Sequence, residues 1–292
     1  NATKLLKMWE EGGMHKAEGI KLKAESNEDF AIIWFQSRLN EVRGEVDILM
    51  SQFRLSEALK TIYSLIWDDF CSWFLEWIKP EYGKAIEAQM YEKAVAFFDA
   101  LLQMLHPFMP FITEEIYHLL KERKDDLIVK QFAPVEKENA ATLAVGNKLK
   151  TIITAIRDAK AKNKLKPKEP VSLYIQTSDE GSYQSIKEIL SKQLHADHIF
   201  FNQVPDSSCI MIVAGDEKMY IKSDAEIDSE VQKEKLIKDL NYLKGFLLVV
   251  DKKLSNDRFV QNAKQEVIEL ERKKKQDAET KIKVIEQTLS AL

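Results

Sequence analysis

Apolar side chains recur every three to four positions between residues 27 and 124, the spacing that places them on one face of a helix. The pattern predicts helices joined by short polar stretches. Four helices are predicted: the first carries the apolar residues from Phe30 to Leu49, and the others are Ser56–Lys79, Lys84–Leu105 and Thr113–Arg123. Short connections between antiparallel helices favour a bundle.

The second predicted helix is rich in aromatic residues and ends at Pro80, because proline cannot continue a helix. The aromatic residues include Trp67, Phe70, Trp73 and Trp77. We expect these four in the core of the bundle. A platform on which nucleic-acid bases stack is the alternative.

A proline-rich corner separates the last two helices. Pro107 disfavours helical backbone at His106, so the third helix should end there. Thr113 suits an N-cap, and Glu114 follows it where the helix dipole favours an anion. The segment Phe108–Ile112 is largely apolar, and we expect it to be buried between the two helices.

Beyond a polar linker, a helix is predicted over about 140–163, and the pattern then changes to the alternation typical of strands. The predicted elements are strand Val171–Ile175, helix Tyr183–Leu194, and strands His198–Asn202, Cys209–Val213 and Lys218–Lys222. Gly215 and Asp216 favour a hairpin between the last two strands. This segment contains no glycine-rich phosphate loop.

From about Asp224, leucines and other apolar residues follow the spacing of a coiled coil. A polar break at Ser255–Asp257 separates two predicted helices, which must therefore fold back on each other as an antiparallel hairpin. Glu271 and Lys275 fall on seam positions, so we expect poorer pairing near the break.

These elements predict a mainly α protein with three domains. They are a helical bundle (1–135), a small α+β domain (136–223) and an antiparallel coiled-coil hairpin that forms an arm (224–292).

Charge is unevenly distributed. The 292 residues carry a net charge of −4, and 31% of them are charged, which suits long exposed helices. Two segments are nonetheless basic: 148–168 holds many Lys and Arg but one Asp, and 252–275 also has an excess of Lys and Arg. Such patches can neutralise phosphates, whereas a solvated helix face is the ordinary alternative.

Few residues suggest catalysis or metal binding. Cys71 and Cys209 match no zinc or redox spacing, which fits a reducing cytoplasm. The five histidines show no mutual spacing typical of a metal site or a proton relay, so we expect ordinary surface or core histidines. Apolar runs are too short to span a bilayer and no signal peptide is visible. The missing initiator Met indicates a piece of a longer protein.

Three stretches resemble one enzyme family. His106–Leu120 resembles the corner of the anticodon-binding domain in the class I aminoacyl-tRNA synthetases for valine, leucine and isoleucine. Lys253–Arg272 resembles the C-terminal arm of the valyl-tRNA synthetase family, although Lys264 stands where that family usually has proline. Ile66–Glu76 is similar to the central helix of the same family. Two cysteines are too few for the zinc module of many isoleucine enzymes.

The resemblance implies a parent enzyme that joins valine to tRNA(Val) with ATP and Mg²⁺ in the cytoplasm. The sequence lacks the HIGH and KMSKS motifs of the family's ATP site and anything like an editing domain. We therefore expect no catalytic residue, no metal ligand and no cofactor in this chain. We expect it to bind tRNA as a monomer, without a membrane.

The resemblance also implies specific contacts with tRNA. The residues that align with the family's anticodon pocket are Lys4, Leu5, Leu75 and Glu76. Glu76 could accept a hydrogen bond from a base amine while a base stacks on an apolar neighbour. The family often has Arg-Phe in place of Lys4-Leu5, and an ordinary core leucine is the alternative for Leu75. Lys274 aligns with a basic arm residue that faces the tRNA body, and its neighbouring candidates are Lys252, Lys253 and Arg272.

Two other interpretations stay open. The chain could be the corresponding part of a leucyl- or isoleucyl-tRNA synthetase, or a non-enzymatic scaffold whose coiled coil binds other proteins. The basic tip of the arm counts against a scaffold, because coils that pair with proteins usually carry their heptads to the end.

Overall fold

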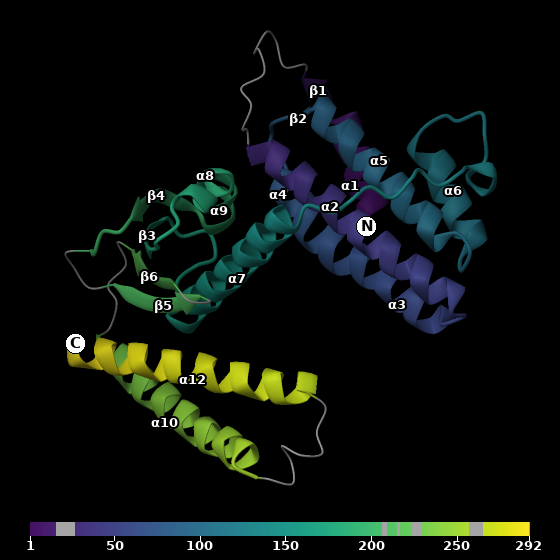
Figure 1. Cartoon of the computed structure of the whole chain (residues 1–292). Coiled ribbons are helices and arrows are strands. Elements are labelled where there is room, and N and C mark those ends of the chain that lie inside the picture. The colour runs from purple at the N-terminus through teal and green to yellow at the C-terminus, as the bar shows by residue number, and fades with distance from the viewer. Residues whose placement is uncertain (16–26, 206–208, 215–216, 224–228, 257–264, 292) are drawn as a thin grey trace. The chain divides into compact units, whose positions relative to one another are not determined.

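The computed structural model describes residues 1–15, 27–205, 209–214, 217–223, 229–256 and 265–291. The chain forms two compact units, Asn1–Asn147 and Lys148–Leu292, each described by itself below (Figure 1). No helix in these described ranges is long and apolar enough to cross a membrane.

The first unit is helical, as predicted. Its elements are α1 (Ala2–Glu11), α2 (Asn27–Ser51), α3 (Leu55–Ser64), η1 (Leu65–Phe74), α4 (Leu75–Ile78), α5 (Ala88–Leu105), α6 (Pro110–Leu120) and η2 (Leu127–Val129), with a short parallel pair β1 (Met14–His15) and β2 (Ile86–Glu87). Helices α2, α3 and α5 pack side by side, and α1 packs against α5 and α6 (Figure 1).

The predicted helix over 56–79 is present but changes type in its middle. α3, η1 and α4 follow one another without a break, and η1 is a π-helix of 10 residues. The backbone N–H of Leu75 accordingly bonds to the carbonyl of Phe70, five residues back, and the Ser72 hydroxyl donates to the Trp67 carbonyl at 2.8 Å. A π-helix this long is unusual, and π-turns often occur at functional sites.

Aromatic rings fill the core of the first unit. The Phe35 ring lies 5.2 Å from that of Phe70 and 5.0 Å from those of Phe74 and Phe97, and all four side chains are buried. Burying such rings removes a large apolar area from water and adds favourable ring contacts.

The four aromatic residues predicted to be core do not share one environment. Phe70 (0% exposed) and Trp77 (3%) are core residues, as expected. Trp73 is half-buried. The prediction is wrong for Trp67, whose side chain is 55% exposed.

The proline corner also departs from expectation. α5 ends at Leu105 as predicted, but α6 begins at Pro110, because proline fits the first position of a helix. Thr113 is therefore not the N-cap; it lies inside α6, and its hydroxyl donates to the Met109 carbonyl at 2.8 Å. Phe111 is 90% exposed and Met109 49%, so the corner is not buried.

The α+β part of the second unit matches the predicted elements closely. The sheet has the order β4-β3-β6-β5 and consists of β3 (Val171–Gln176), β4 (Ala196–Phe201), β5 (Ile210–Ala214) and β6 (Glu217–Lys222). β3 pairs with β4 in parallel and with β6 antiparallel, and β5 pairs with β6 antiparallel. The proposed turn at Gly215 and Asp216 lies outside the described residues.

Helices α7 (Ala140–Lys162), α8 (Gly181–Gln184) and α9 (Lys187–Leu194) complete this part of the chain. α7 begins in the first unit and continues into the second. Alternate residues of β3, namely Val171, Leu173 and Ile175, are buried, as the alternating pattern predicted.

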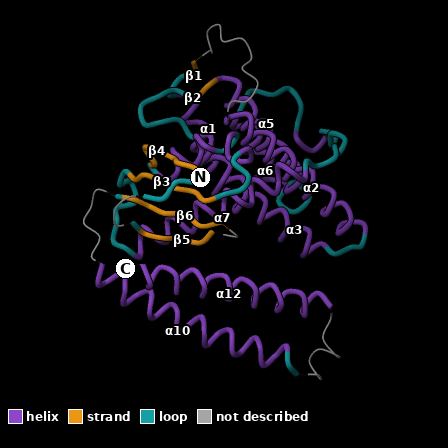
Figure 2. The backbone as a smooth tube through the Cα atoms, turned by 60° about the vertical axis from the view of Figure 1, so that its left-hand side comes forward, coloured by secondary structure: helices purple, strands orange, loops and turns teal. Residues whose placement is uncertain are grey.

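The last two helices are α10 (Ser229–Leu254) and α12 (Gln265–Ala291), which run side by side (Figure 2). Their ion pairs define an antiparallel arrangement, because Lys244 near the middle of α10 meets Glu286 and Asp251 further along meets Lys275. Val250 and Ala278 are buried between the helices. The pairing of two antiparallel helices is thus confirmed, whereas knobs-into-holes coiled-coil packing stays a prediction.

Candidate nucleic-acid interface

Leu75 and Glu76 lie together at the start of α4, directly after the π-helix. Leu75 is 2% exposed, so its side chain cannot stack on a base in this structure, and the alternative of a core leucine describes it. The Glu76 side chain is 45% exposed and forms an ion pair with Lys79 at 3.1 Å. Such exposed pairs contribute little, so a base amine can compete with Lys79 for the carboxylate.

Lys4 and Leu5 lie on α1, where Lys4 is exposed and Leu5 half-buried. α1 packs against α5 and α6, whereas α4 packs against α2 and η1. The structure therefore brings Leu75 and Glu76 together. A common pocket of these two with Lys4 and Leu5 stays a prediction.

The candidate arm residues lie on both helices near the end that carries the break. Lys252 and Lys253 are in the last turn of α10, and both are exposed. Arg272 on α12 is exposed, and Lys274 is half-buried. Cations from two helices thus lie at the same end of the hairpin.

Glu271 contacts two of these cations, one on each helix. It is 6% exposed, as its predicted seam position required. Lys274 donates a hydrogen bond to it at 2.7 Å, and Lys253 on α10 lies 3.6 Å from its other oxygen. The hydrogen bond from Lys274 is the main reason why the pKa of Glu271 is lowered. Lys274, the first candidate for tRNA contact, therefore also stabilises the hairpin.

Two cations of the basic segment 148–168 are held within the α+β part of the chain, whereas its exposed cations are Arg157, Lys162, Lys164, Lys166 and Lys168. Lys160 is 2% exposed and donates to the backbone carbonyls of Glu169 (2.8 Å) and Leu194 (2.6 Å), and burial lowers its pKa. Lys148 forms an ion pair with Glu217 at 2.9 Å, and Tyr183 donates a hydrogen bond to the same carboxylate. At least these two cations hold the α+β fold together and are not available to phosphates.

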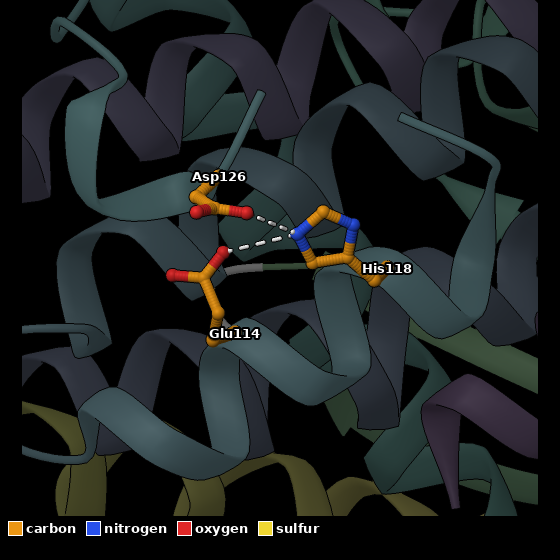
Figure 3. A group of neighbouring side chains, drawn as sticks. All are labelled: Glu114, His118 and Asp126. Atoms are coloured by element: carbon orange, nitrogen blue, oxygen red, sulfur yellow. Dashed lines mark hydrogen bonds and ion pairs between the residues drawn. The ribbon is translucent and has the colours of Figure 1, made fainter. Parts of the chain in front are cut away.

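One histidine lies in a cluster that the sequence analysis did not find. Glu114 and His118 are one turn apart on α6, and Asp126 comes from the segment that follows (Figure 3). His118 Nε2 lies 3.3 Å from Glu114 and 3.0 Å from Asp126. The spacing of four residues on one helix face was the available signal for the first pair. That Asp126 lies beside His118 could not be predicted from the sequence, because it depends on how the segment after α6 folds back.

The cluster has a structural explanation without a metal ion. The Glu114 carboxylate accepts hydrogen bonds from the backbone N–H groups of Leu127 at 2.6 Å and Ile128 at 3.3 Å. It thereby satisfies free donors at the start of η2, in the way that a capping residue does. His118 then joins this carboxylate to Asp126. These contacts fasten the segment after α6 to the helix.

A surface feature with exposed aromatic rings was also missed. Tyr63 on α3 and Trp67 on η1 are 59% and 55% exposed, and their rings are nearly parallel, with centroids 6.2 Å apart. Their spacing of four residues places both rings on one helix face, but spacing alone does not show whether another segment covers that face.

Comparisons with known proteins agree with the two helical regions. A family model described as "Anticodon-binding domain of tRNA ligase" matches residues 33–175, and one described as "Valyl tRNA synthetase tRNA binding arm" matches residues 227–292. The first includes most of the bundle, and the second includes α10 and α12.

Curated proteins named valine–tRNA ligase match over the entire chain. The one from Porphyromonas gingivalis is 38% identical over 294 residues, which are 100% of this chain and 32% of that protein. The one from Christiangramia forsetii is 34% identical over 295 residues, 100% of this chain and 33% of that protein. The chain thus spans about a third of the length of the curated relatives it matches.

Proposed function

The chain belongs to the valine–tRNA ligase family and matches the C-terminal portion of its longer members, and from this we propose that it is the tRNA-binding part of an enzyme that joins valine to tRNA(Val). One observation carries the proposal. The chain combines a helical bundle that matches an anticodon-binding domain with a helix pair that matches a tRNA-binding arm.

The bundle is proposed to bind the anticodon through the surface at the start of α4. Glu76 presents an exposed carboxylate, which can accept a hydrogen bond from the exocyclic amine of a base. The buried Leu75 supports the backbone beneath Glu76 and does not contact RNA itself. Lys4, which is exposed on α1, would supply a positive charge to a nearby phosphate.

The helix pair is proposed to be an antiparallel coiled-coil arm that contacts the tRNA body with Lys252, Lys253, Arg272 and Lys274. Three of these side chains are exposed, and Lys274 is half-buried while it holds Glu271. Binding by the arm does not require contacts with particular bases, because cations at one end of a helix pair can bind the phosphate backbone of any folded tRNA.

Valine activation is proposed to occur elsewhere in the parent enzyme, with ATP and Mg²⁺. The 292 residues contain neither HIGH nor KMSKS, the sequences that mark the ATP site in the resembling enzymes. We further propose a cytoplasmic parent, a monomeric chain, and the three-domain division at residues 135 and 223.

A gel shift with purified tRNAs tests the binding function. The chain should shift tRNA(Val) at lower protein concentration than tRNA(Leu) or tRNA(Ile), and added salt should weaken all complexes because phosphate contacts release counterions. A preference for tRNA(Leu) or tRNA(Ile) would favour the alternative synthetases. Absence of binding to every tRNA, at low salt, by both the chain and the parent enzyme would favour the scaffold.

The variant Glu76→Ala tests the anticodon contact in the parent enzyme. If Glu76 reads a base, kcat/KM for tRNA should fall by the equivalent of about 1–3 kcal/mol, while valine-dependent ATP–pyrophosphate exchange stays unchanged. Lys79→Ala is the matched control, since it removes the ion pair but leaves the carboxylate. Normal charging by Glu76→Ala would assign Glu76 to an ordinary exposed helix position.

A further inference from the structure

An apolar groove of about 460 Å³ lies on the first unit, between one face of α3, the start of η1, the end of α5 and the corner that follows it. Its apolar lining consists of Leu59, Tyr63, Ile66, Trp67, Leu105 and Met109. The groove is therefore formed by two segments that are about forty residues apart in the chain and meet at one end of the bundle.

The aromatic and sulfur-containing side chains of the groove are exposed to an unusual degree. Tyr63, Trp67 and Met109 are 59%, 55% and 49% exposed, and Phe111 beyond Met109 is 90% exposed. Single exposed apolar residues are common, but clusters of large ones mark surfaces that bind a protein, a membrane or another ligand. Tyr, Trp and Met are also the residue types enriched at the centres of such interfaces.

We propose that this groove docks onto the remaining part of the parent ligase, through an apolar surface of that part. The inference rests on the proposed function, because it requires that the chain be part of a longer ligase. The relatives match this chain over its whole length yet are about three times longer, so some two thirds of the polypeptide is available as the partner.

RNA fits the groove less well than protein does. Lys60 is the one charged residue among the lining residues of the groove, and the neighbours Glu57 and Asp68 are acidic. Proteins that stack bases on aromatic rings normally surround those rings with several cations that bind the phosphates. The stacked pair Tyr63 and Trp67 therefore suits an apolar protein surface.

The groove is also separate from the proposed anticodon contact. It occupies the first half of the helical run from Leu55 to Ile78, whereas Glu76 lies at the other end. The bundle can therefore pack against the parent with one end and bind tRNA with the other.

Hydroxyl-radical footprinting of the full-length parent and of this chain, both without tRNA, tests the proposal. Oxidation of Tyr63, Trp67 and Met109 should be severalfold slower in the parent, because docking excludes solvent from them. Tyr82, which is fully exposed outside the groove, is the internal control and should react equally in both samples.

Each alternative occupant gives a different result that overturns the proposal. Equal oxidation in parent and chain would mean that the groove is not covered by the parent. Protection that appears only when tRNA is added would assign the groove to RNA. Protection in the isolated chain that increases with its concentration, and equals that of the parent, would assign it to a second copy.

The variant Trp67→Gln provides a second readout. It should lower the unfolding temperature of the parent but leave that of the isolated chain and its tRNA gel shift unchanged. Ile48→Gln is the matched control, because Ile48 is a similarly exposed helical residue (58%) that does not line the groove. An unchanged unfolding temperature of the Trp67→Gln parent would contradict the proposal. Absence of a tRNA gel shift with the wild-type chain would instead contradict the proposed function.

Discussion

The bundle and the α10–α12 hairpin are both helical, but different interactions hold them together. In the bundle, Phe35 is surrounded by aromatic rings at 5.0–5.2 Å, and two ion pairs, Arg38–Asp69 and Arg123–Asp99, include a largely buried carboxylate. In the hairpin, the described buried residues are Val250, Ala278 and Glu271, and ion pairs join the two helices along their length.

The buried carboxylates of the bundle and of the hairpin also differ in their surroundings. Arg38 donates to the nearly buried Asp69 at 2.8 Å, and Arg123 donates two hydrogen bonds to Asp99 at 2.8 and 2.7 Å. Burial raises the pKa of Asp99, even though Arg123 acts in the opposite direction. The hairpin carboxylate Glu271 has a lowered pKa, because its lysines outweigh burial. A packed core thus tolerates its charges, whereas the hairpin depends on them.

The largest expected effect is the loss of a ring from the bundle core. Phe35→Ala should cost about 3–5 kcal/mol of unfolding free energy, because it leaves a cavity among the rings of Phe70, Phe74 and Phe97. Tyr242→Ala in α10 removes a ring that is 72% exposed and should change stability by less than about 0.5 kcal/mol. Urea unfolding followed by circular dichroism measures both. Equal effects would contradict the difference in packing.

Glycine substitutions are expected to have the next largest effect. A Cβ on Gly146 would lie 2.2 Å from the Trp34 ring, so Gly146→Ala should cost about 1–3 kcal/mol through overpacking. The same change at Gly44 in α2 or Gly245 in α10 meets open space and should stabilise by about 0.5–1 kcal/mol, because alanine favours helix. A stable Gly146→Ala variant would mean that Trp34 can move aside.

Charge reversal on the hairpin should separate RNA contact from helix pairing. Arg272→Glu should weaken tRNA binding and lower the slope of log K against log salt by about one unit, with the hairpin intact. Lys274→Glu should weaken binding too, but it also removes the hydrogen bond to the buried Glu271 and should loosen the hairpin. Gel shifts in a salt series, with amide exchange of α12, distinguish the two. Unchanged binding by both variants would remove the arm from the interface.

The smallest expected effect is a pH dependence confined to the hairpin. The pKa of Glu271 is lowered in the folded state, so its contribution to stability is present above its ordinary value of 4.5 and is lost as the pH falls below that. Amide exchange in α12 should therefore accelerate below about pH 4.5 while the core of α5 stays protected. Glu271→Gln should weaken the dependence, and an unchanged pH profile would argue against this role.

Much of the fold could be predicted because it follows from local sequence. Proline at 107 ended α5, alternation at 171–175 specified β3, and the seam spacing placed Glu271 between two helices. The candidate site residues Glu76, Lys252, Lys253 and Arg272 are accessible to solvent, and their contact with tRNA stays a prediction. The start of α6 was misplaced because Pro110 and Thr113 are both good helix-start residues and the choice between them depends on tertiary contacts.

By itself, the sequence determined most of the long helices, the strands of the four-stranded sheet, the pairing of α10 with α12 and the family to which the chain belongs. The tertiary structure alone decided which apolar side chains are covered. Trp67 and Leu75 follow the same helical pattern, yet one is exposed and the other buried. The physical reason is that periodicity specifies the direction of a side chain from its helix, whereas burial depends on what packs there. Segments distant in sequence, such as Asp126 beside His118, meet only when the chain is folded.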